Sequence, residues 1–239
     1  MVPDSHHLLL TRPQAQAERF AASFTARFGA DWKIVISPLI EIGFLSVGVN
    51  TKRYAGLIFT SENGVLAYAE TNPDRNLPAY CVGQKTAQAG RRAGLVISAI
   101  AADAKALVQM VAAQKQPGPL LHLHGEHTAG DVAQCLNSAG TETEERIIYT
   151  QTPRDLTAQA RSSLSSPGGV LLPLFSPRTA RLFQIQAQAM EPDLRVAALS
   201  QAVADSLAMP IRRLEVAQRP DGPAMLDALA LLIAATSPA

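Results

Sequence analysis

The chain has 239 residues, which on a prior of roughly 100–200 residues per domain allows one large domain or two small ones. Apolar residues make up 47 % and charged residues 17 %, so the chain can bury a core and is not disordered. The net charge of +1 excludes a broad basic surface for nucleic acid, so any site for an anion must be local.

Cysteine usage and hydropathy indicate a soluble protein of a reducing compartment. Cys81 and Cys135 have neither metal-binding nor redox spacing, which indicates free thiols. Polar and charged residues follow the leucines at 8–10 almost at once, so we expect no signal peptide. The most apolar stretch, 225–235, is too short for a membrane span and contains Asp227. We therefore expect a cytoplasmic protein that binds neither nucleic acid nor a membrane.

Short apolar runs alternate with longer helical patterns along almost the whole chain. In chain order we predict strand 7–11, helix 13–28, strand 55–60, helix 62–71, strand 79–82, helix 84–93, strand 95–98, helix 102–114, strand 120–124, helix 128–139, helix 155–164, strand 170–175, helix 177–189, strand 195–199, helix 201–208, strand 212–216 and helix 223–235. Pro13, Pro177 and Pro223 suit first helical turns, and Gly29 and Gly140 suit helix ends. This alternation predicts α/β units with parallel sheets.

Two extended segments interrupt the alternation. Residues 33–45 are rich in isoleucine with no helix before Lys52, and residues 145–152 end at Pro153. Both segments border the block 53–143, which we interpret as a domain inserted between two strands. The other domain is then discontinuous and consists of residues 1–32 and 154–239, with 33–52 and 144–153 connecting the two.

Internal similarity supports a duplication. Residues 56–64 and 171–178 are both apolar runs that end in a serine, Ser61 or Ser176, before a helical stretch. Residues 80–87 resemble 197–204 in the same order. The third similarity is permuted, because 122–125 closes the inserted block whereas 8–12 opens the chain. This order is expected if the chain arose by duplication and one copy is inserted into the other.

The predicted strand ends carry residues suited to an anion. Open α/β sheets bind ligands beyond the carboxyl ends of their strands, where helix N-termini favour negative charge. These strand-end residues are Arg12, Thr60 with Ser61, Gly83, His124 with Gly125, Phe175 with Ser176, and Ser200. Helix capping alone, worth about 1 kcal/mol, also explains each hydroxyl, whereas the whole set favours one cleft shared by two domains.

Three histidines, His122, His124 and His127, invite a metal-site interpretation. A strand places His122 and His124 on one face, but Glu126 is the one carboxylate nearby in sequence, so we expect no metal. We expect His122 to be partly buried and His124 to donate a hydrogen bond at the cleft. The turn at Gly83 matches neither a Walker motif nor a dinucleotide fingerprint, and no signature of a covalent or hydrolytic enzyme occurs.

Tyr149 lies in the extended segment between the two expected domains. Its hydroxyl could act as a general acid or as a donor to a leaving group. An aromatic ring packed at an inter-domain strand is the alternative, and the residues alone favour packing.

The ordered set of motifs resembles the uroporphyrinogen-III synthase family. The motifs are Leu-Thr-Arg-Pro at 10–13, Phe-Thr-Ser-Glu-Asn-Gly at 59–64, Val-Gly-Gln-Lys-Thr-Ala at 82–87, His124-Gly125 with Gly130, Ile-Tyr-Thr at 148–150 and Phe-Ser-Pro-Arg at 175–178. The resemblance implies two flavodoxin-like or Rossmann-like α/β domains with parallel sheets, joined by a two-stranded antiparallel ladder. It also implies that no metal or organic cofactor is needed.

The activity that this resemblance implies is that of a lyase in tetrapyrrole biosynthesis. Linear hydroxymethylbilane is converted to uroporphyrinogen III with loss of water and inversion of the last pyrrole ring. Tyr149 matches the family tyrosine thought to assist departure of the hydroxyl, and Thr60, Ser61, Thr86 and Ser176 match positions expected to contact substrate carboxylates. We expect a monomer that receives its substrate from hydroxymethylbilane synthase.

Some residues depart from the family pattern. The family often has glycine and threonine at Ser200 and Val203, arginine at His124 and threonine at Phe175. We therefore expect the inserted domain to supply the more polar half of the binding surface. Two other function classes stay open: a non-catalytic two-domain module that closes on a small anionic ligand, and a nucleotide-dependent α/β enzyme.

Overall fold

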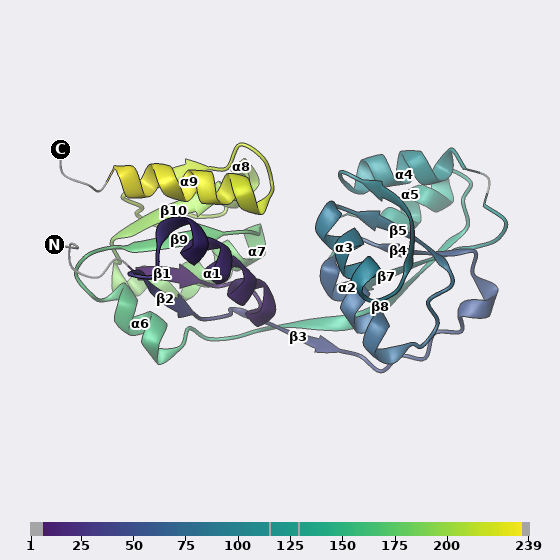
Figure 1. The fold of residues 1–239 in the computed structure, drawn as a ribbon, viewed down its shortest axis with the longest axis horizontal. Helices are drawn as coiled ribbons and strands as arrows, with labels where there is room; N and C mark the ends of the chain where they lie inside the picture. Colours follow the sequence, from purple (N-terminus) through teal and green to yellow (C-terminus); the bar gives the residue numbers. More distant parts are fainter. Residues whose placement is uncertain (1–6, 115, 129, 236–239) are drawn as a thin grey trace. The chain divides into compact units, whose positions relative to one another are not determined.

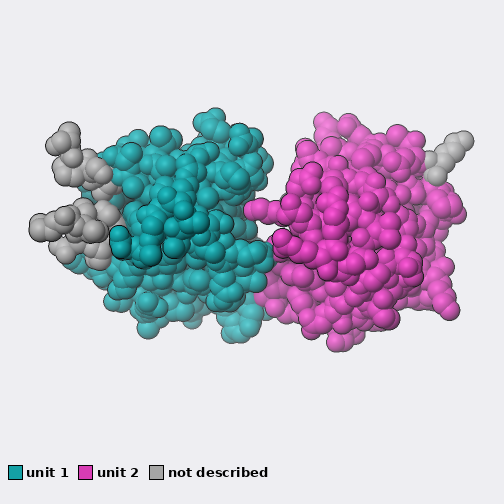
Figure 2. All heavy atoms as spheres, in the orientation of Figure 1, with its two compact units in different colours: residues 1–41, 152–239 teal, residues 42–151 magenta. Residues whose placement is uncertain are grey.

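The computed structural model describes residues 7–114, 116–128 and 130–235. The chain divides into two compact units (Figure 2). Unit 1 comprises Met1–Glu41 and Thr152–Ala239, and unit 2 comprises Ile42–Gln151. Among the described residues, no helix combines the length and the apolar character needed to cross a membrane.

Unit 1 is a five-stranded parallel sheet with helices on both faces (Figure 1). Its elements are β1 (His7–Leu10), α1 (Gln14–Phe28), β2 (Lys33–Ile36), α6 (Ala158–Leu164), β9 (Val170–Leu174), α7 (Pro177–Ala187), the short 3-10 helix η2 (Gln188–Met190), β10 (Leu194–Ala198), α8 (Gln201–Ala204), β11 (Arg213–Val216) and α9 (Gly222–Ala234). The strand order is β11-β10-β9-β1-β2. If the strands are numbered 1 to 5 along unit 1 and the sheet is read from β2 to β11, the order is 2-1-3-4-5, as in flavodoxin-like sheets.

Unit 2 contains a six-stranded sheet in the order β3-β8-β7-β4-β5-β6. Its elements are β3 (Ile40–Phe44), the 3-10 helix η1 (Thr51–Arg53), β4 (Gly56–Phe59), α2 (Glu62–Thr71), β5 (Pro78–Val82), α3 (Gln84–Arg92), β6 (Val96–Ala101), α4 (Ala104–Ala112), β7 (Leu120–Gly125), α5 (Val132–Ser138) and β8 (Thr143–Pro153). The pairings from β8 through β7, β4 and β5 to β6 are all parallel. The parallel α/β architecture predicted from the sequence is therefore confirmed.

Alternating side chains bury both faces of each sheet. In β1, Leu9 joins the core under α6, α7 and α8, whereas Leu8 and Leu10 join the core under α1 and α9. In β4, Phe59 packs with α2 and α3, and Ile58 packs with α4 and α5. Strands covered on both faces need apolar residues at successive positions, which explains the short continuous runs in the sequence.

The two sheets share one strand order once the chain is permuted. Unit 2 has the order β8-β7-β4-β5-β6, and unit 1 has the order β2-β1-β9-β10-β11. When the two orders are aligned, β4 corresponds to β9, β5 to β10 and β7 to β1. These pairs contain the three sequence similarities at 56–64 and 171–178, at 80–87 and 197–204, and at 122–125 and 8–12. The topology thus supports a duplication in which one copy is inserted into the other.

The chain passes between the units along β3 and β8, which are hydrogen-bonded neighbours. The Arg154 amide donates to the Leu39 carbonyl and the Leu45 amide donates to the Ile148 carbonyl, so the two segments run antiparallel. Arg154 also forms an ion pair with Glu41.

Both connecting segments also contribute to the sheets, which the sequence-based boundaries at 33–52 and 144–153 did not include. Residues 33–36 form β2 at the edge of the first sheet, parallel to β1. From Thr143 onward β8 pairs in parallel with β7, as far as Tyr149. The difference arises because one uninterrupted extended run serves first as a sheet edge and then as a connection.

Candidate functional site

The candidate residues of unit 2 gather where the connections diverge from β4 and β7. These strands are adjacent and parallel, and the chain continues from β4 toward β5 on one side, whereas β7 leads to β8 on the other. Such a switch point is where open α/β sheets bind ligands, beyond the carboxyl ends of the strands. Thr60 and Ser61 follow β4 there, and Gly125 ends β7.

Ser61 joins the start of α2 to the phenol of Tyr149. The Gly64 amide donates to Ser61 Oγ over 3.1 Å, which makes Ser61 the N-cap of α2. The same oxygen lies 2.8 Å from the Tyr149 hydroxyl. The capping interpretation of Ser61 is therefore confirmed, and the residue also holds the tyrosine in place.

Tyr149 is a buried phenol whose ring packs in the core between β8 and α2. Its side chain is only 4 % exposed. Burial raises the pKa of the Tyr149 phenol, and the hydrogen bond from Ser61 opposes that rise without cancelling it. The hydroxyl is therefore protonated at neutral pH and can donate.

Gly125 provides the space that the Tyr149 ring occupies. The register of β7 and β8 shifts between His124 and Gly125, which places Gly125 opposite Tyr149. A Cβ atom on Gly125 would lie 2.3 Å from Tyr149 Cε2. The Glu126 amide also donates to the Tyr149 carbonyl over 3.2 Å. The direct role of Gly125 in the structure is thus to position the tyrosine, a role the sequence did not reveal.

His122 and His124 lie next to each other on one face of β7, with ring centroids 4.7 Å apart. His122 Nε2 is 3.3 Å from Thr60 Oγ1, and His124 Nδ1 is 2.7 Å from the Gly125 carbonyl. His122 is fully buried rather than partly buried as expected, and burial, with a smaller contribution from His124, lowers its pKa to about 3. His122 is therefore neutral.

Gly83 and Thr86 occupy the turn from β5 into α3. Gly83 has φ +81°, in the region that favours glycine, and no atom lies within 4 Å of the position where a Cβ would stand. Thr86 is buried in the first turn of α3. The open backbone of Gly83 is therefore the more accessible of these two candidates.

Unit 1 presents its candidates at the carboxyl ends of β1 and β9. The Arg12 guanidinium carbon lies 3.8 Å from the centre of the Phe175 ring, which also packs edge-on against the Phe20 ring at a centroid distance of 5.1 Å. Stacking on an aromatic face orients an arginine without neutralising it. Phe175 therefore gives Arg12 a defined position.

The two capping serines are geometrical equivalents. Ser61 has φ −147° and ψ 152°, and Ser176 has φ −151° and ψ 149°. Ser176 Oγ accepts from the Thr179 amide over 3.1 Å, so it caps α7 as Ser61 caps α2. Ser200, which precedes α8 with φ −158°, makes no side-chain capping bond and has an extended backbone, unlike Gly83 in the equivalent position of unit 2.

The structure thus brings together two sets of predicted residues, one at each sheet edge. In unit 2, Ser61 and Gly125 both contact Tyr149, and Thr60 contacts His122, whose ring lies beside that of His124. Arg12, Phe175 and Ser176 lie together in unit 1. The single cleft shared by the two sets stays a prediction.

We expect Gly125→Ala to destabilise unit 2, because the added methyl group overlaps the Tyr149 ring. Overpacking of this kind costs about 1–3 kcal/mol. Gly48→Ala is the matched control, since a Cβ atom at that position would meet nothing within 4 Å. Thermal unfolding followed by circular dichroism, with near-ultraviolet signals for tyrosine packing, measures the difference. Equal melting of the two variants would contradict the packing of Tyr149 on Gly125.

Comparisons with known proteins agree with this architecture. The model of the family described as uroporphyrinogen-III synthase HemD matches residues 21–227. Curated protein sequences gave no significant match.

Two solved structures resemble the chain over nearly its whole length. The uroporphyrinogen-III synthetase of Helicobacter pylori 26695 has a TM-score of 0.67 at 17 % identity, with 96 % of this chain and 99 % of that chain covered. A mutant uroporphyrinogen III synthase of the extremely thermophilic bacterium Thermus thermophilus has a TM-score of 0.57 at 14 % identity, with 97 % and 100 % covered. These likenesses confirm the fold, and the match over 21–227 shows that the chain belongs to the uroporphyrinogen-III synthase family.

Proposed function

We propose that this chain is the lyase that cyclises hydroxymethylbilane to uroporphyrinogen III in tetrapyrrole biosynthesis. The family match over residues 21–227 is the observation that carries this proposal. The reaction removes one molecule of water and inverts the last pyrrole ring. Unassisted closure gives the type I isomer, so the enzyme must favour attack by the substituted carbon of the terminal ring. Control of this kind comes from holding the linear chain in one geometry.

The Tyr149 phenol is the group we assign to departure of the substrate hydroxyl. As the carbon–oxygen bond breaks, the phenol gives its proton to the leaving oxygen, which departs as water and leaves an electrophilic azafulvenium ion beside the phenolate. Return of the pyrrole N–H proton to the phenolate gives the neutral azafulvene and restores the phenol. Burial raises the pKa of the phenol, so the group is protonated at neutral pH and has a proton to give to the leaving hydroxide. Ser61 Oγ lies 2.8 Å from the Tyr149 hydroxyl and holds it in position. The serine hydroxyl can also donate a hydrogen bond to the tyrosine oxygen after the phenol has given up its proton.

Substrate carboxylates are assigned to the strand ends of both units. Arg12 offers a guanidinium held in one orientation by Phe175, and a fork of N–H groups suits a carboxylate. Helix N-termini after Ser61 and Ser176 favour negative charge. We assign hydroxyl contacts with the carboxylates to Thr60, Ser61, Thr86, Ser176 and Ser200. Gly83 and Gly125 allow the backbone to approach the substrate closely, and His124 offers an imidazole.

We further propose that the protein acts as a cytoplasmic monomer that takes its substrate from hydroxymethylbilane synthase. The reactivity of the linear substrate supports this, since free hydroxymethylbilane closes to the type I isomer without help. A short path between the two enzymes limits that loss.

A two-domain module that binds a small anion without chemistry is the second candidate function. Two capped helix N-termini and a stacked arginine would serve such a module equally well. It differs from the enzyme in leaving the isomer distribution of the products unchanged.

Isomer analysis separates these two functions. We expect freshly prepared hydroxymethylbilane to give mainly uroporphyrinogen III with this protein and mainly type I without it. The products are oxidised to porphyrins and separated by chromatography. A predominance of type I in both samples would reject the proposed activity and leave the binding module.

We expect Tyr149→Phe to lower kcat by about 10²-fold, the lower range for loss of a positioned acid. The phenylalanine keeps the ring over Gly125, so the melting temperature should change little. Ser61→Ala is the comparison variant, because it removes the partner of the hydroxyl and the cap of α2 but leaves the phenol. Unchanged turnover in Tyr149→Phe would remove the hydroxyl from the mechanism.

We expect Arg12→Gln to raise KM by about 10–100-fold, the loss that accompanies removal of one charge-assisted hydrogen bond. Phe175→Thr should raise KM less, because Arg12 keeps its charge but loses its platform. Arg27→Gln is the control, since Arg27 lies at the far end of α1 and pairs with Asp227. Steady-state kinetics decide the point, and an Arg12→Gln enzyme with wild-type KM would refute carboxylate recognition by Arg12.

A further inference from the structure

We propose that His122, His124 and Glu145 form a binding site for one divalent transition-metal ion of the zinc class. The site lies on the face of β7 and β8 that α5 covers, and it shares His124 with the proposed substrate-binding residues, although the ion itself takes no part in the proposed cyclisation. The sequence predicts no metal here, because Glu126 is the only carboxylate near the histidines along the chain. The structure supplies a different carboxylate from the neighbouring strand.

Strand register brings the three side chains together. His122 and His124 are two residues apart on β7 and share a face, and Glu145 on β8 lies directly opposite His122. One ligand atom from each residue can be chosen so that all lie within 4.8 Å of one another. His124 Nε2 is 3.8 Å from a Glu145 carboxylate oxygen.

Each histidine has one ring nitrogen held by an oxygen and one ring nitrogen without a hydrogen-bond partner. Among the described residues, His122 Nδ1 and His124 Nε2 are buried nitrogen atoms that make no hydrogen bond. Both residues are more than nine-tenths buried. Buried polar atoms are seldom left without a partner, so these two atoms indicate a missing ligand.

The hydrogen bonds at the other nitrogens select the tautomers that a metal requires. The Gly125 carbonyl can only accept, so His124 carries its proton on Nδ1 and keeps a lone pair on Nε2. In the matching tautomer of His122, Nε2 donates to Thr60 Oγ1 and Nδ1 keeps the lone pair. Metal-binding histidines typically donate their second N–H to a carbonyl, carboxylate or water in this way.

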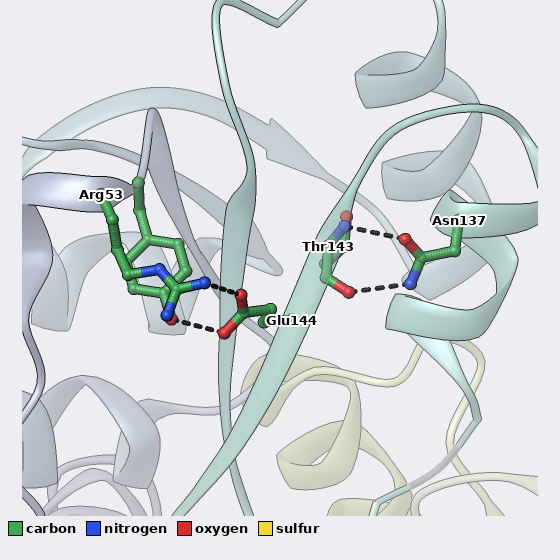
Figure 3. Close-up of polar contacts among 5 residues, drawn as sticks. Arg53, Asn137, Thr143 and Glu144 are labelled. Atoms are coloured by element: carbon green, nitrogen blue, oxygen red, sulfur yellow. Dashed lines mark hydrogen bonds and ion pairs between the residues drawn. The ribbon is translucent and has the colours of Figure 1, made fainter.

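Polar contacts fix the start of β8 just before Glu145. The Thr143 amide donates to Asn137 Oδ1 over 2.9 Å and Asn137 Nδ2 donates to the Thr143 carbonyl over 2.8 Å (Figure 3). Glu144 points the other way and accepts from Arg53 and from the Tyr54 hydroxyl. The backbone beneath Glu145 is therefore held on both sides.

The Glu145 side chain itself can reach the histidines. It is 59 % exposed and lines a cavity of about 590 Å³ together with Asp131 and Asn137, so the carboxylate is accessible from solvent. Ligand atoms of a tetrahedral zinc site are separated by about 3.3 Å, given bonds of about 2.0–2.1 Å. A shift of well under one side-chain length by Glu145 closes the observed 3.8 Å to that value.

The donor set favours zinc over hard cations. Two imidazole nitrogens and one carboxylate suit Zn²⁺ or Co²⁺, whereas Ca²⁺ and Mg²⁺ prefer oxygen ligands throughout. Three protein ligands leave the fourth position of a tetrahedral zinc site open. A bound ion would join β7 to β8 one residue before Gly125, and so stabilise the strand end against which Tyr149 packs.

The test measures Zn²⁺ and Co²⁺ binding to the whole chain after treatment with a chelator and its removal. We expect one Zn²⁺ per chain in competition with a chromophoric chelator, a higher melting temperature with Zn²⁺, and visible absorption of a tetrahedral Co²⁺ complex. We expect Glu145→Gln to weaken Zn²⁺ binding by about 10–100-fold. Glu142→Gln and His127→Ala are the matched controls, since both residues are exposed and lie outside the cluster.

Binding results alone decide the proposal, so its failure is separate from any failure of the cyclisation assay. No Zn²⁺ binding by the wild-type chain would overturn it, as would equal affinity in wild type and Glu145→Gln. His124→Gln gives a second comparison if Glu145→Gln folds poorly, and wild-type affinity in that variant overturns the proposal too. An ion pair between His124 and Glu145 without metal predicts these negative results.

Discussion

The contact of Tyr149 with Ser61 and Gly125 connects the three elements that form the carboxyl edge of unit 2. The ring belongs to β8, the space beneath it to β7, and the partner of its hydroxyl is the N-cap residue of α2. Each part constrains the others: a side chain at 125 would displace the ring, and a displaced ring would lose Ser61. The register shift between β7 and β8 at this point is the backbone feature that makes the arrangement possible.

The permuted duplication explains why the two units present such similar edges with different chemistry. Ser61 and Ser176 keep nearly the same backbone angles and the same capping bond, because a helix N-terminus has unsatisfied amides wherever it occurs. The residues beside them have diverged. Unit 2 places a histidine pair and a buried phenol near its serine, whereas unit 1 places an arginine on a phenylalanine.

The sequence predicted the elements well because local signals determine them. Apolar runs of strand length, prolines in first turns and serines before helices are each read without knowledge of the partner strand. The resemblance placed Tyr149 in the site, but its contact with Gly125 depends on a register shift that no spacing reveals. Glu145 was missed for the same reason, since it lies 21 residues from His124 in sequence and becomes its neighbour only through pairing of β7 with β8.

The charge balance of the chain bears on how a polycarboxylate could be bound. With a net charge of +1, attraction at long range is weak, so recognition has to come from donors in fixed positions. Stacking of Arg12 on Phe175 and the hydrogen bond between Ser61 and Tyr149 orient two of the proposed donors before any ligand arrives. Donors held in place lose little conformational freedom on binding, so more of the binding energy remains for selecting one geometry of a flexible substrate. In a reaction whose product depends on which carbon attacks, that selection is the catalytic task.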